Sequence, residues 1–222
     1  MKQNNFLSGE TILYFDCYSG VSGDMTLGAL LDLGVDLQKL QDMLTTLNLE
    51  GYRLTSKEVK RGAISGTQAV VEVDNSPVME RNLKTIVEMI NRSSLPDSVK
   101  ENSCSVFKLL AEAEASVHGI PVSKVHFHEV GAVDAIIDVV GTCAALFLLE
   151  VDHIICSPVP LARGEVQAAH GKLPLPAPAT LELLAGRQVP LKGSDLDFEM
   201  VTPTGAALIA ALSESFGELP SF

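Results

Sequence analysis

Basic residues are scarce in this 222-residue sequence, which has 16 Lys and Arg against 28 Asp and Glu and a formal net charge of −12. Proteins that bind nucleic acids usually carry a basic surface, so this charge balance argues against a nucleic-acid partner. An acidic surface is compatible with the handling of cations, although acidic proteins are common. We therefore look for cation sites and expect no nucleic acid.

Cysteines are few and widely spaced, at Cys17, Cys104, Cys143 and Cys156, and none belongs to a CxxC pair. This spacing argues against a structural zinc knuckle and against a framework of disulfides. A chain with such cysteines fits a reducing compartment, and we expect a cytoplasmic location.

Long apolar runs are absent. The most apolar segment, residues 135–149, is interrupted by Asp138 and is shorter than the roughly 20 residues that a membrane-spanning helix requires. The N-terminus has no basic region followed by an apolar stretch, so we expect neither a signal peptide nor a membrane partner. The hydrophobic fraction of 46% supports a well-filled core and permits a homo-oligomer, which we expect.

Walker A and GxGxxG sequences are also absent, but a Ser- and Gly-rich turn, YSGVSGD at residues 18–24, joins a predicted strand to a predicted helix. Backbone N–H groups in such a turn, aided by the helix dipole, can bind a phosphate. Alternatively, the turn only connects the two elements and Ser22 or Asp24 caps the helix. The candidate anion-binding residues are Ser19, Gly20, Ser22, Gly23 and Asp24.

The central segment KVHFHEVGAVDAIIDVVG, residues 124–141, concentrates chemically active side chains in an apolar setting. On a strand, His126 and His128 would share one face. From about Glu129 the apolar spacing becomes helical, which places Asp134 and Asp138 one turn apart on the same side. Like charges at this spacing repel, so a cation, a basic partner or water should compensate them.

Imidazoles and carboxylates together form a ligand set for a divalent ion such as nickel, zinc, manganese or iron. The alternative is that the histidines cap the sheet edge and the aspartates face solvent. A carboxylate in so apolar a run is unfavourable unless it is paired or functional, which keeps the metal or catalytic interpretation open.

Two later segments offer further contacts. Residues 161–175 are predicted to be an irregular loop in which Arg163 and His170 can reach an anionic substrate or simply lie on the surface. In VTPTG, residues 201–205, Thr202 or Thr204 can cap the last helix, whose N-terminus is another possible anion site. His118, just before Gly119, is interpreted as a helix-terminal capping residue rather than a ligand.

Strands alternate with helices along much of the chain, which predicts an α/β fold with a mixed sheet and flanking helices. Predicted helices cover residues 25–33, 36–47, 81–91, 96–118, a segment following residue 129, 177–185 and 206–216. Predicted strands cover residues 11–17, 52–59, 64–73 and 153–157.

Four long motifs lie in order along the chain: YFDCYSGVSGDMTLGALLDLG, VHFHEVGAVDAIIDVVG, AHGKLPLPAPATLELL and VTPTGAAL. Together they resemble the LarC family, at similar spacing and over nearly the whole chain. Members of that family are nickel-insertion proteins, described as pyridinium-3,5-bisthiocarboxylic acid mononucleotide nickel chelatases. The resemblance implies CTP-dependent nickel insertion, with Mg or Mn, at the last step in making the nickel-pincer cofactor of lactate racemase, a lyase-type reaction.

Two features depart from that family. Many members carry a His-rich tract where this chain has DNSPVME at residues 74–80, so bulk nickel storage there is not expected. Full-length members also continue into a C-terminal domain to which the resemblance assigns CTP binding. We therefore expect residues 1–222 to be the N-terminal domain, which requires that second domain, in cis or as a separate chain, for activity.

The residues and the resemblance together give one working mechanism. We expect His126, His128 and Glu129, then Asp134, to hold nickel, and His170 or Glu129 to act as the general acid–base. The 18–24 turn, Arg163 and the 202–205 helix start would hold the anionic mononucleotide. The alternatives are a nickel metallochaperone, a scaffold for the second domain, and a metal-dependent phosphohydrolase.

Overall fold

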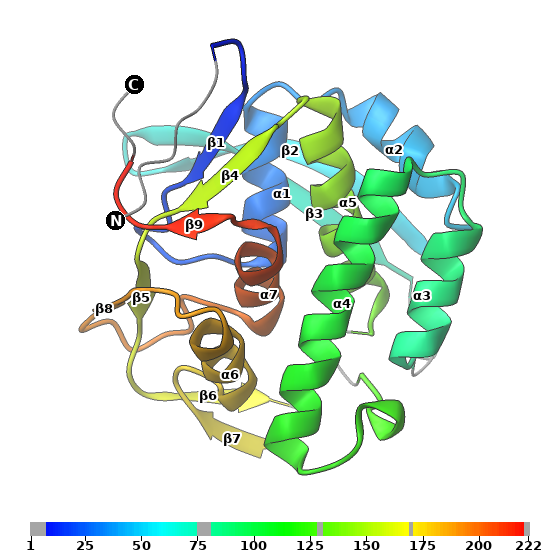
Figure 1. Cartoon of the computed structure of the whole chain (residues 1–222). Helices are drawn as coiled ribbons and strands as arrows, with labels where there is room; N and C mark the ends of the chain where they lie inside the picture. Colours follow the sequence, from blue (N-terminus) through cyan, green and yellow to red (C-terminus); the bar gives the residue numbers. More distant parts are fainter. Residues whose placement is uncertain (1–7, 75–80, 128–130, 169–170, 220–222) are drawn as a thin grey trace.

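The computed structural model describes residues 8–74, 81–127, 131–168 and 171–219, in which helices and short strands alternate (Figure 1). The helices are α1 (Gly23–Asp32), α2 (Leu37–Thr45), α3 (Leu83–Arg92), α4 (Asp97–His118), the short 3-10 helix η1 (Val122–Lys124), α5 (Val133–Leu148), α6 (Pro178–Gly186) and α7 (Pro203–Leu212). The strands are β1 (Ile12–Phe15), β2 (Tyr52–Arg61), β3 (Ile64–Val73), β4 (His153–Cys156), β5 (Val159–Leu161), β6 (Glu165–Ala168), β7 (Gly171–Pro174), β8 (Leu191–Gly193) and β9 (Ser215–Phe216).

The predicted α/β class, with both parallel and antiparallel pairing, is confirmed. Across the described ranges, the pairings are divided among small sheets: a parallel sheet in the order β1-β4-β9, a parallel pair β5-β8, and the hairpins β2-β3 and β6-β7. No helix in the described part of the chain is both long and apolar enough to cross a bilayer.

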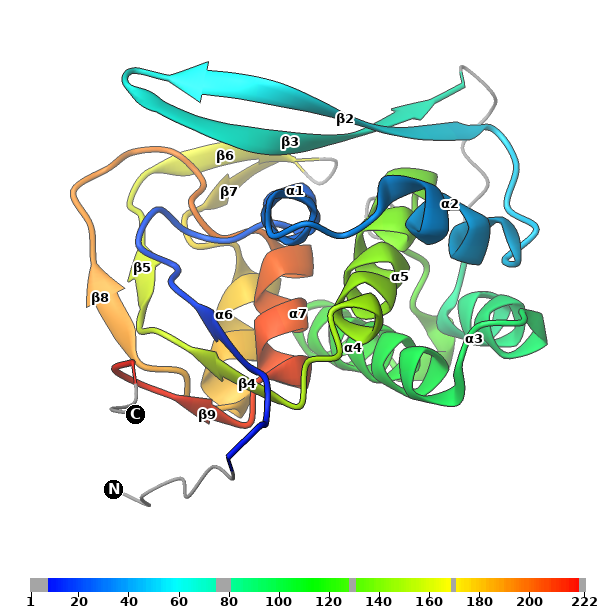
Figure 2. The same ribbon diagram turned by 90° about the horizontal axis from the view of Figure 1, so that it is seen from above.

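The β2–β3 hairpin lies across one side of the molecule, with α1 directly beneath it (Figure 2). Both strands begin where the sequence predicts, and they meet at a turn containing Gly62, whose φ of 61° suits glycine. Gly28 lets α1 approach closely, because an added Cβ would lie 2.7 Å from the carbonyl oxygen of Thr67 on β3. The hairpin thus covers α1 and leaves the N-terminus of α1 free to face the rest of the protein.

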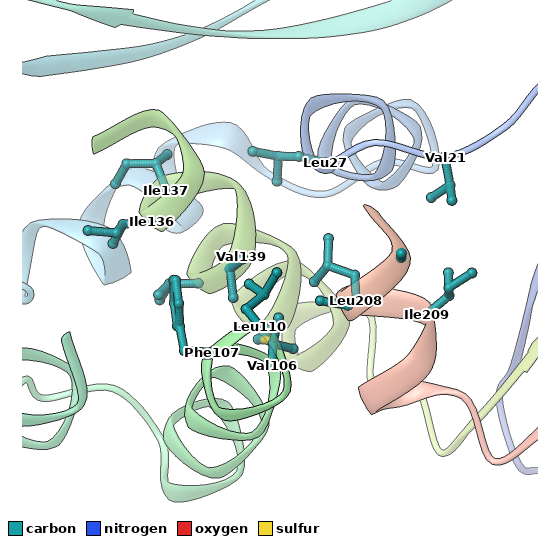
Figure 3. Packing of buried hydrophobic residues seen from close by; sticks show 14 of the residues in the cluster. Val21, Leu27, Val106, Phe107, Leu110, Ile136, Ile137, Val139, Leu208 and Ile209 are labelled. Carbon is teal, nitrogen blue, oxygen red and sulfur yellow. The ribbon is translucent and has the colours of Figure 1, made fainter. Parts of the chain in front are cut away.

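Helix α5 runs through the centre of the core, where it packs against α1, α2 and α4. Its inner face is fully buried at Ile136, Ile137 and Val139, as the apolar spacing of the sequence predicts. These side chains belong to the same buried cluster as Phe107 of α4 and Leu27 of α1 (Figure 3). Because α5 is anchored on several sides, the aspartates on its first two turns are held in fixed positions.

Two predictions about the later chain are wrong in detail. The predicted helix 206–216 ends at Leu212, and residues 215–216 pair as β9 with β4, because the open edge of that strand supplies hydrogen bonds that a longer helix cannot use. The predicted irregular loop 161–175 contains the hairpin β6-β7, and the preceding residues 159–161 form β5. All of these strands are short and depend on partners that local sequence does not reveal.

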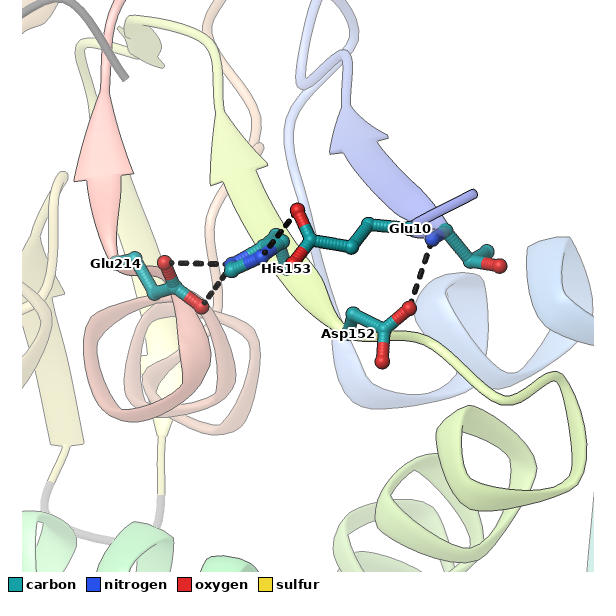
Figure 4. Close-up of polar contacts among 5 residues, drawn as sticks. Glu10, Asp152, His153 and Glu214 are labelled. Atoms are coloured by element: carbon teal, nitrogen blue, oxygen red, sulfur yellow. Dashed lines mark hydrogen bonds and ion pairs between the residues drawn. The ribbon is translucent and has the colours of Figure 1, made fainter. Parts of the chain in front are cut away.

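The exposed end of the three-stranded sheet is held by a carboxylate–imidazole–carboxylate contact (Figure 4). The Nδ1 atom of His153 lies 3.0 Å from Glu214, and its Nε2 atom lies 3.3 Å from Glu10. The hydrogen bond with Glu214 is the main cause that raises the pKa of His153. This contact links residues that precede β1, begin β4 and precede β9.

Candidate functional site

A cleft of about 370 Å³ lies where the N-termini of α1 and α7 meet α4, α5 and the β6-β7 hairpin. Its polar lining residues are Ser22, Asp24, Glu114, His118, His126, Asp134, Asp138, Glu199, Thr202 and Thr204. Its apolar walls include Phe127, Val166 and Leu173. An apolar cleft with a few converging polar groups is the usual form of a small-ligand site.

One wall is the start of α1, which the Ser- and Gly-rich turn leads into. Ser22 is the N-cap, and its hydroxyl accepts a hydrogen bond from the backbone N–H of Met25 at 3.3 Å. The same hydroxyl donates to the carboxylate of Asp24. The capping interpretation of Ser22 is therefore confirmed, and Ser22, Gly23 and Asp24 at the start of α1 line the cleft.

The start of α7 lies beside the start of α1. Val21 and Val201 form a parallel bridge, in which Val21 N–H donates to Met200 at 2.8 Å and Thr202 N–H donates to Val21 at 3.1 Å. Thr202 then caps α7 by accepting from Gly205 N–H at 3.1 Å. Two helix N-termini, each capped by a hydroxyl, therefore border one cleft.

Glycines make this close approach possible. At Gly205 an added Cβ would lie 2.3 Å from the carbonyl oxygen of Val21, and at Gly20 it would lie 1.9 Å from that of Met200. Gly20 also has a φ of 96°, which a larger side chain rarely adopts. Gly20 thus lets the two segments pack together, and it does not line the cleft.

The opposite wall is the first part of α5. Asp134 and Asp138 lie one helical turn apart and both line the cleft, as the spacing predicts. Asp134 is exposed, whereas Asp138 lies deeper and is half-buried. Gly23 makes room for Asp138, because a Cβ at residue 23 would lie only 2.7 Å from its Oδ2 atom.

Asp138 is the most perturbed acid of the cleft. Its Oδ1 atom is buried and finds no hydrogen-bond partner among the described residues. Burial, followed by the nearby charges of Asp24 and Asp134, raises the pKa of Asp138 from 3.8 to about 7. A carboxyl group in this state can accept a proton or interact with a cation near neutral pH.

The remaining wall supplies imidazoles and more acids. His118 ends α4 before Gly119, as predicted, and its Nε2 atom lies 3.3 Å from Glu114. His126 is exposed and is positioned by its neighbour Phe127, whose N–H donates to Arg81 at 3.1 Å. In all, five carboxylates and two imidazoles line the cleft, and none of the described residues lining it is Lys or Arg.

The structure brings together many of the sequence-predicted site residues. Those that line the cleft are Ser22, Gly23, Asp24, His126, Asp134, Thr202 and Thr204. Ser19 instead lines a second cleft on the other side of the same turn, and Arg163 is exposed and lines neither cleft.

His128, Glu129 and His170 lie outside the described residues, so their predicted roles remain predictions. In the described ranges, no group of three His, Cys, Asp or Glu side chains is placed so that it could hold a metal ion. A metal site that uses His126 or Asp134 would therefore need further ligands beyond those described ranges, from the substrate or from solvent.

Comparison with protein families matches residues 13–222 to the family described as "Nickel insertion protein". The chain belongs to this nickel insertion protein family. The family resemblance of the four sequence motifs is thereby confirmed. All four of these motifs supply residues of the cleft, namely the segments around residues 18–24, 124–141, 173–179 and 201–205.

Curated relatives agree with this family. A pyridinium-3,5-bisthiocarboxylic acid mononucleotide nickel insertion protein of Geobacillus kaustophilus is 46% identical over 95% of this chain and 53% of its own length. A protein of the same name from Desulfitobacterium hafniense is 47% identical over 93% of this chain and 51% of its own length. A relative from Roseiflexus castenholzii is 50% identical over 91% of this chain and 51% of its own length.

The chain thus spans about half the length of the curated relatives it matches. No solved structure matches it. The architecture of this part of the nickel insertion protein family is therefore described from the present fold.

Sequence reasoning did not assign Glu114 or Glu199 to a site, it grouped Asp138 with Asp134 without giving it a role, and it treated His118 only as a helix-terminal residue. Glu114 and Glu199 lie in ordinary polar contexts, so nothing local marks them. Asp138 did carry a signal, because it interrupts the most apolar run of the chain. Its depth in the cleft, however, depends on Gly23 of a different helix.

Proposed function

We propose that this chain is the part of a nickel insertion protein that brings nickel and a pyridinium-3,5-bisthiocarboxylic acid mononucleotide together in the 370 Å³ cleft. The observation that carries the proposal is the convergence of four separate family motifs on that one cleft. The names of the relatives supply the metal and the mononucleotide.

Nickel would be a substrate here, held loosely enough to be handed over to sulfur. Imidazole and carboxylate ligands suit such a role, because thiolates on the protein would compete with the thiocarboxylates of the substrate. We assign His126 and Asp134 as cleft-lining ligands and retain His128 and Glu129 as the predicted additional ligands. An incomplete ligand set on the protein leaves coordination positions open for the substrate.

The anionic mononucleotide meets a cleft with five carboxylates and, among the described residues that line it, no Lys or Arg. The N–H groups at the starts of α1 and α7 favour anions, but the carboxylates repel them. A divalent cation at Asp24, Asp134 or Asp138 would reverse this balance. We therefore infer that metal binds before, or together with, the mononucleotide.

Nickel insertion through a carbon–metal bond displaces the proton of a ring carbon, and this proton needs an acceptor. Asp138 joins Glu129 and His170 as a candidate, because its buried carboxyl group has no hydrogen-bond partner among the described residues. With a pKa of about 7 it can take up a proton near neutral pH.

The finer aspects of the activity rest on the family resemblance and belong to the whole protein. We propose that insertion depends on CTP with Mg or Mn bound by a further domain, and that the product is the cofactor of lactate racemase. We also propose that the protein is a lyase-class chelatase and a homo-oligomer. We further propose a cytoplasmic location, with which the four free cysteines are consistent.

Calorimetry with Ni²⁺ tests the proposal directly on this chain. We expect micromolar binding that weakens at least about tenfold in the His126→Ala, His128→Ala double variant and in Asp134→Asn. His153→Gln is a matched control, because it removes an imidazole from the sheet edge and leaves the cleft intact. Absence of binding, or equal loss in the control, would contradict the assignment of the metal to this cleft.

Reconstitution with the proposed CTP-binding domain and CTP separates insertion from the alternatives. Formation of nickel-loaded mononucleotide supports the proposal. Nickel binding without any product favours a metallochaperone, and full activity in the ligand variants favours a scaffold. Phosphate release from a generic ester would instead indicate a phosphohydrolase.

A further inference from the structure

Two cysteines that are distant in the sequence meet in the fold. The sulfur atoms of Cys17 and Cys156 lie 3.6 Å apart, although 139 positions separate the two residues. Cys156 ends β4, Cys17 follows the neighbouring parallel strand β1, and the N–H of Cys17 donates to Ser157 Oγ at 2.9 Å. The strand register therefore holds both thiols in contact.

The two thiols are chemically unequal. A hydrogen bond with Cys156 is the main cause that lowers the pKa of Cys17, and the same contact raises the pKa of Cys156. Burial raises the pKa of Cys104, and it raises that of Cys143 to about 12. Of the four cysteines, Cys17 is the one whose pKa is lowered, which favours its thiolate, and it has a second thiol beside it.

The second cleft is lined by chain neighbours of both cysteines. Cys17 is 3% exposed and Cys156 is fully buried. However, Asp16, Tyr18 and Ser157, their chain neighbours, line the second cleft, which has a volume of about 680 Å³. Both cysteines are thus next in the chain to cleft-lining residues without lining the cleft themselves, and the reaction requires a small oxidant to pass these neighbours.

We propose that Cys17 and Cys156 form a redox-active dithiol that a small hydroperoxide converts into an intramolecular disulfide. The Cys17 thiolate attacks one peroxide oxygen and the O–O bond breaks. With hydrogen peroxide this gives a sulfenic acid and hydroxide, which leaves as water with the thiol proton. The Cys156 sulfur then attacks the Cys17 sulfur, the S–O bond breaks, and the hydroxide leaves as a second water with the Cys156 proton.

In this sequence each sulfur loses one electron and the peroxide gains two. The cross-link requires the sulfur atoms to approach from 3.6 Å to about 2.05 Å. It would join β4 to the residue that precedes the 18–24 turn, and it would close a long loop of the unfolded chain. Such a closure should raise the thermal midpoint of unfolding.

Treatment of the chain with hydrogen peroxide, followed by thiol counting in denaturant, tests the proposal. We expect the four free thiols of the reduced chain to fall to two, with a Cys17–Cys156 peptide in the mass map. Dithiothreitol should restore four thiols, and the oxidised chain should melt at a higher temperature. The untreated wild-type chain serves as the reference, so the test does not depend on any variant folding.

Two variants sharpen the test. Cys104→Ser removes a more accessible thiol and should still lose two thiols. Cys156→Ser should stop at a sulfenic acid on Cys17, which a 1,3-dione traps. Retention of all four thiols, a cross-link to Cys104 or Cys143, or direct over-oxidation of Cys17 would overturn the proposal. None of these outcomes depends on nickel binding in the first cleft.

Discussion

Replacing Asp138 by Asn should make the protein progressively more stable than the wild type as the pH rises through neutrality. The Asp138 carboxyl group has a buried oxygen without a partner among the described residues, and Gly23 encloses it from the side of α1. Burial, then Asp24 and Asp134, raises its pKa from 3.8 to about 7. The asparagine amide has nearly the same shape and carries no charge at any pH.

The magnitude follows from proton linkage. Because the folded protein binds the Asp138 proton more tightly than the unfolded chain, its free energy of unfolding falls as the pH rises from about 4 to about 7. The difference between a pKa of 3.8 and one of about 7 corresponds to a loss of about 4 kcal/mol in the free energy of unfolding. An unpaired amide would itself cost about 1–3 kcal/mol at every pH, so the net gain above neutrality should be about 1–3 kcal/mol.

Urea unfolding followed by circular dichroism, from about pH 5 to about pH 8, measures this difference. Glu72→Gln on the exposed face of β3 is the matched control, because solvent surrounds its side chain. We expect Ni²⁺ to reduce the advantage of the variant, since a cation in the cleft compensates the wild-type charge. A difference between Asp138→Asn and the wild type that stays constant over this pH range would refute the reasoning.

Three further changes probe other parts of the fold. Gly205→Ala should destabilise by about 2–4 kcal/mol, because the new Cβ would lie 2.3 Å from the carbonyl oxygen of Val21, whereas Gly186→Ala meets open space and should be nearly neutral in the same urea titration. Phe107→Ala should lower the free energy of unfolding by about 3–5 kcal/mol, because it creates a cavity in the core. Calorimetric melting would detect this loss, and an unchanged midpoint would disprove it. His153→Gln should lower the thermal midpoint below about pH 6.5, where the imidazolium contacts stabilise the wild type. The two proteins should converge as the pH rises through the raised pKa of His153, and an equal loss at all pH values would contradict this.

Elements with a clear local period were predictable from the sequence. The β2–β3 hairpin and helix α4, which ends before Gly119, agree closely with their predicted ranges. The apolar spacing also predicts the inner face of α5, because side chains three and four positions apart share one side of a helix. Strands β5, β6, β7, β8 and β9 were not predictable, since each is short and most of their partners lie far along the chain.

The candidate site shows the same division. Sequence reasoning identified the turn at residues 18–24, the aspartates of α5 and the start of α7 as separate candidates, because capping and helical spacing are local properties. His128, Glu129 and His170 remain predictions, as they lie outside the described residues. The sequence alone therefore determined which groups can carry chemistry and on which elements they lie.

Only the tertiary structure decided which of these groups meet. The bridge between Val21 and Val201 joins two helix starts about 180 residues apart and separates Ser22 from Ser19, which faces another cleft. The burial of Asp138 depends on Gly23, and the contact of Cys17 with Cys156 depends on strand register. The burial of a side chain, the shift of its pKa and its contacts with distant residues all depend on which elements pack against it. Those elements come together only when the whole chain folds.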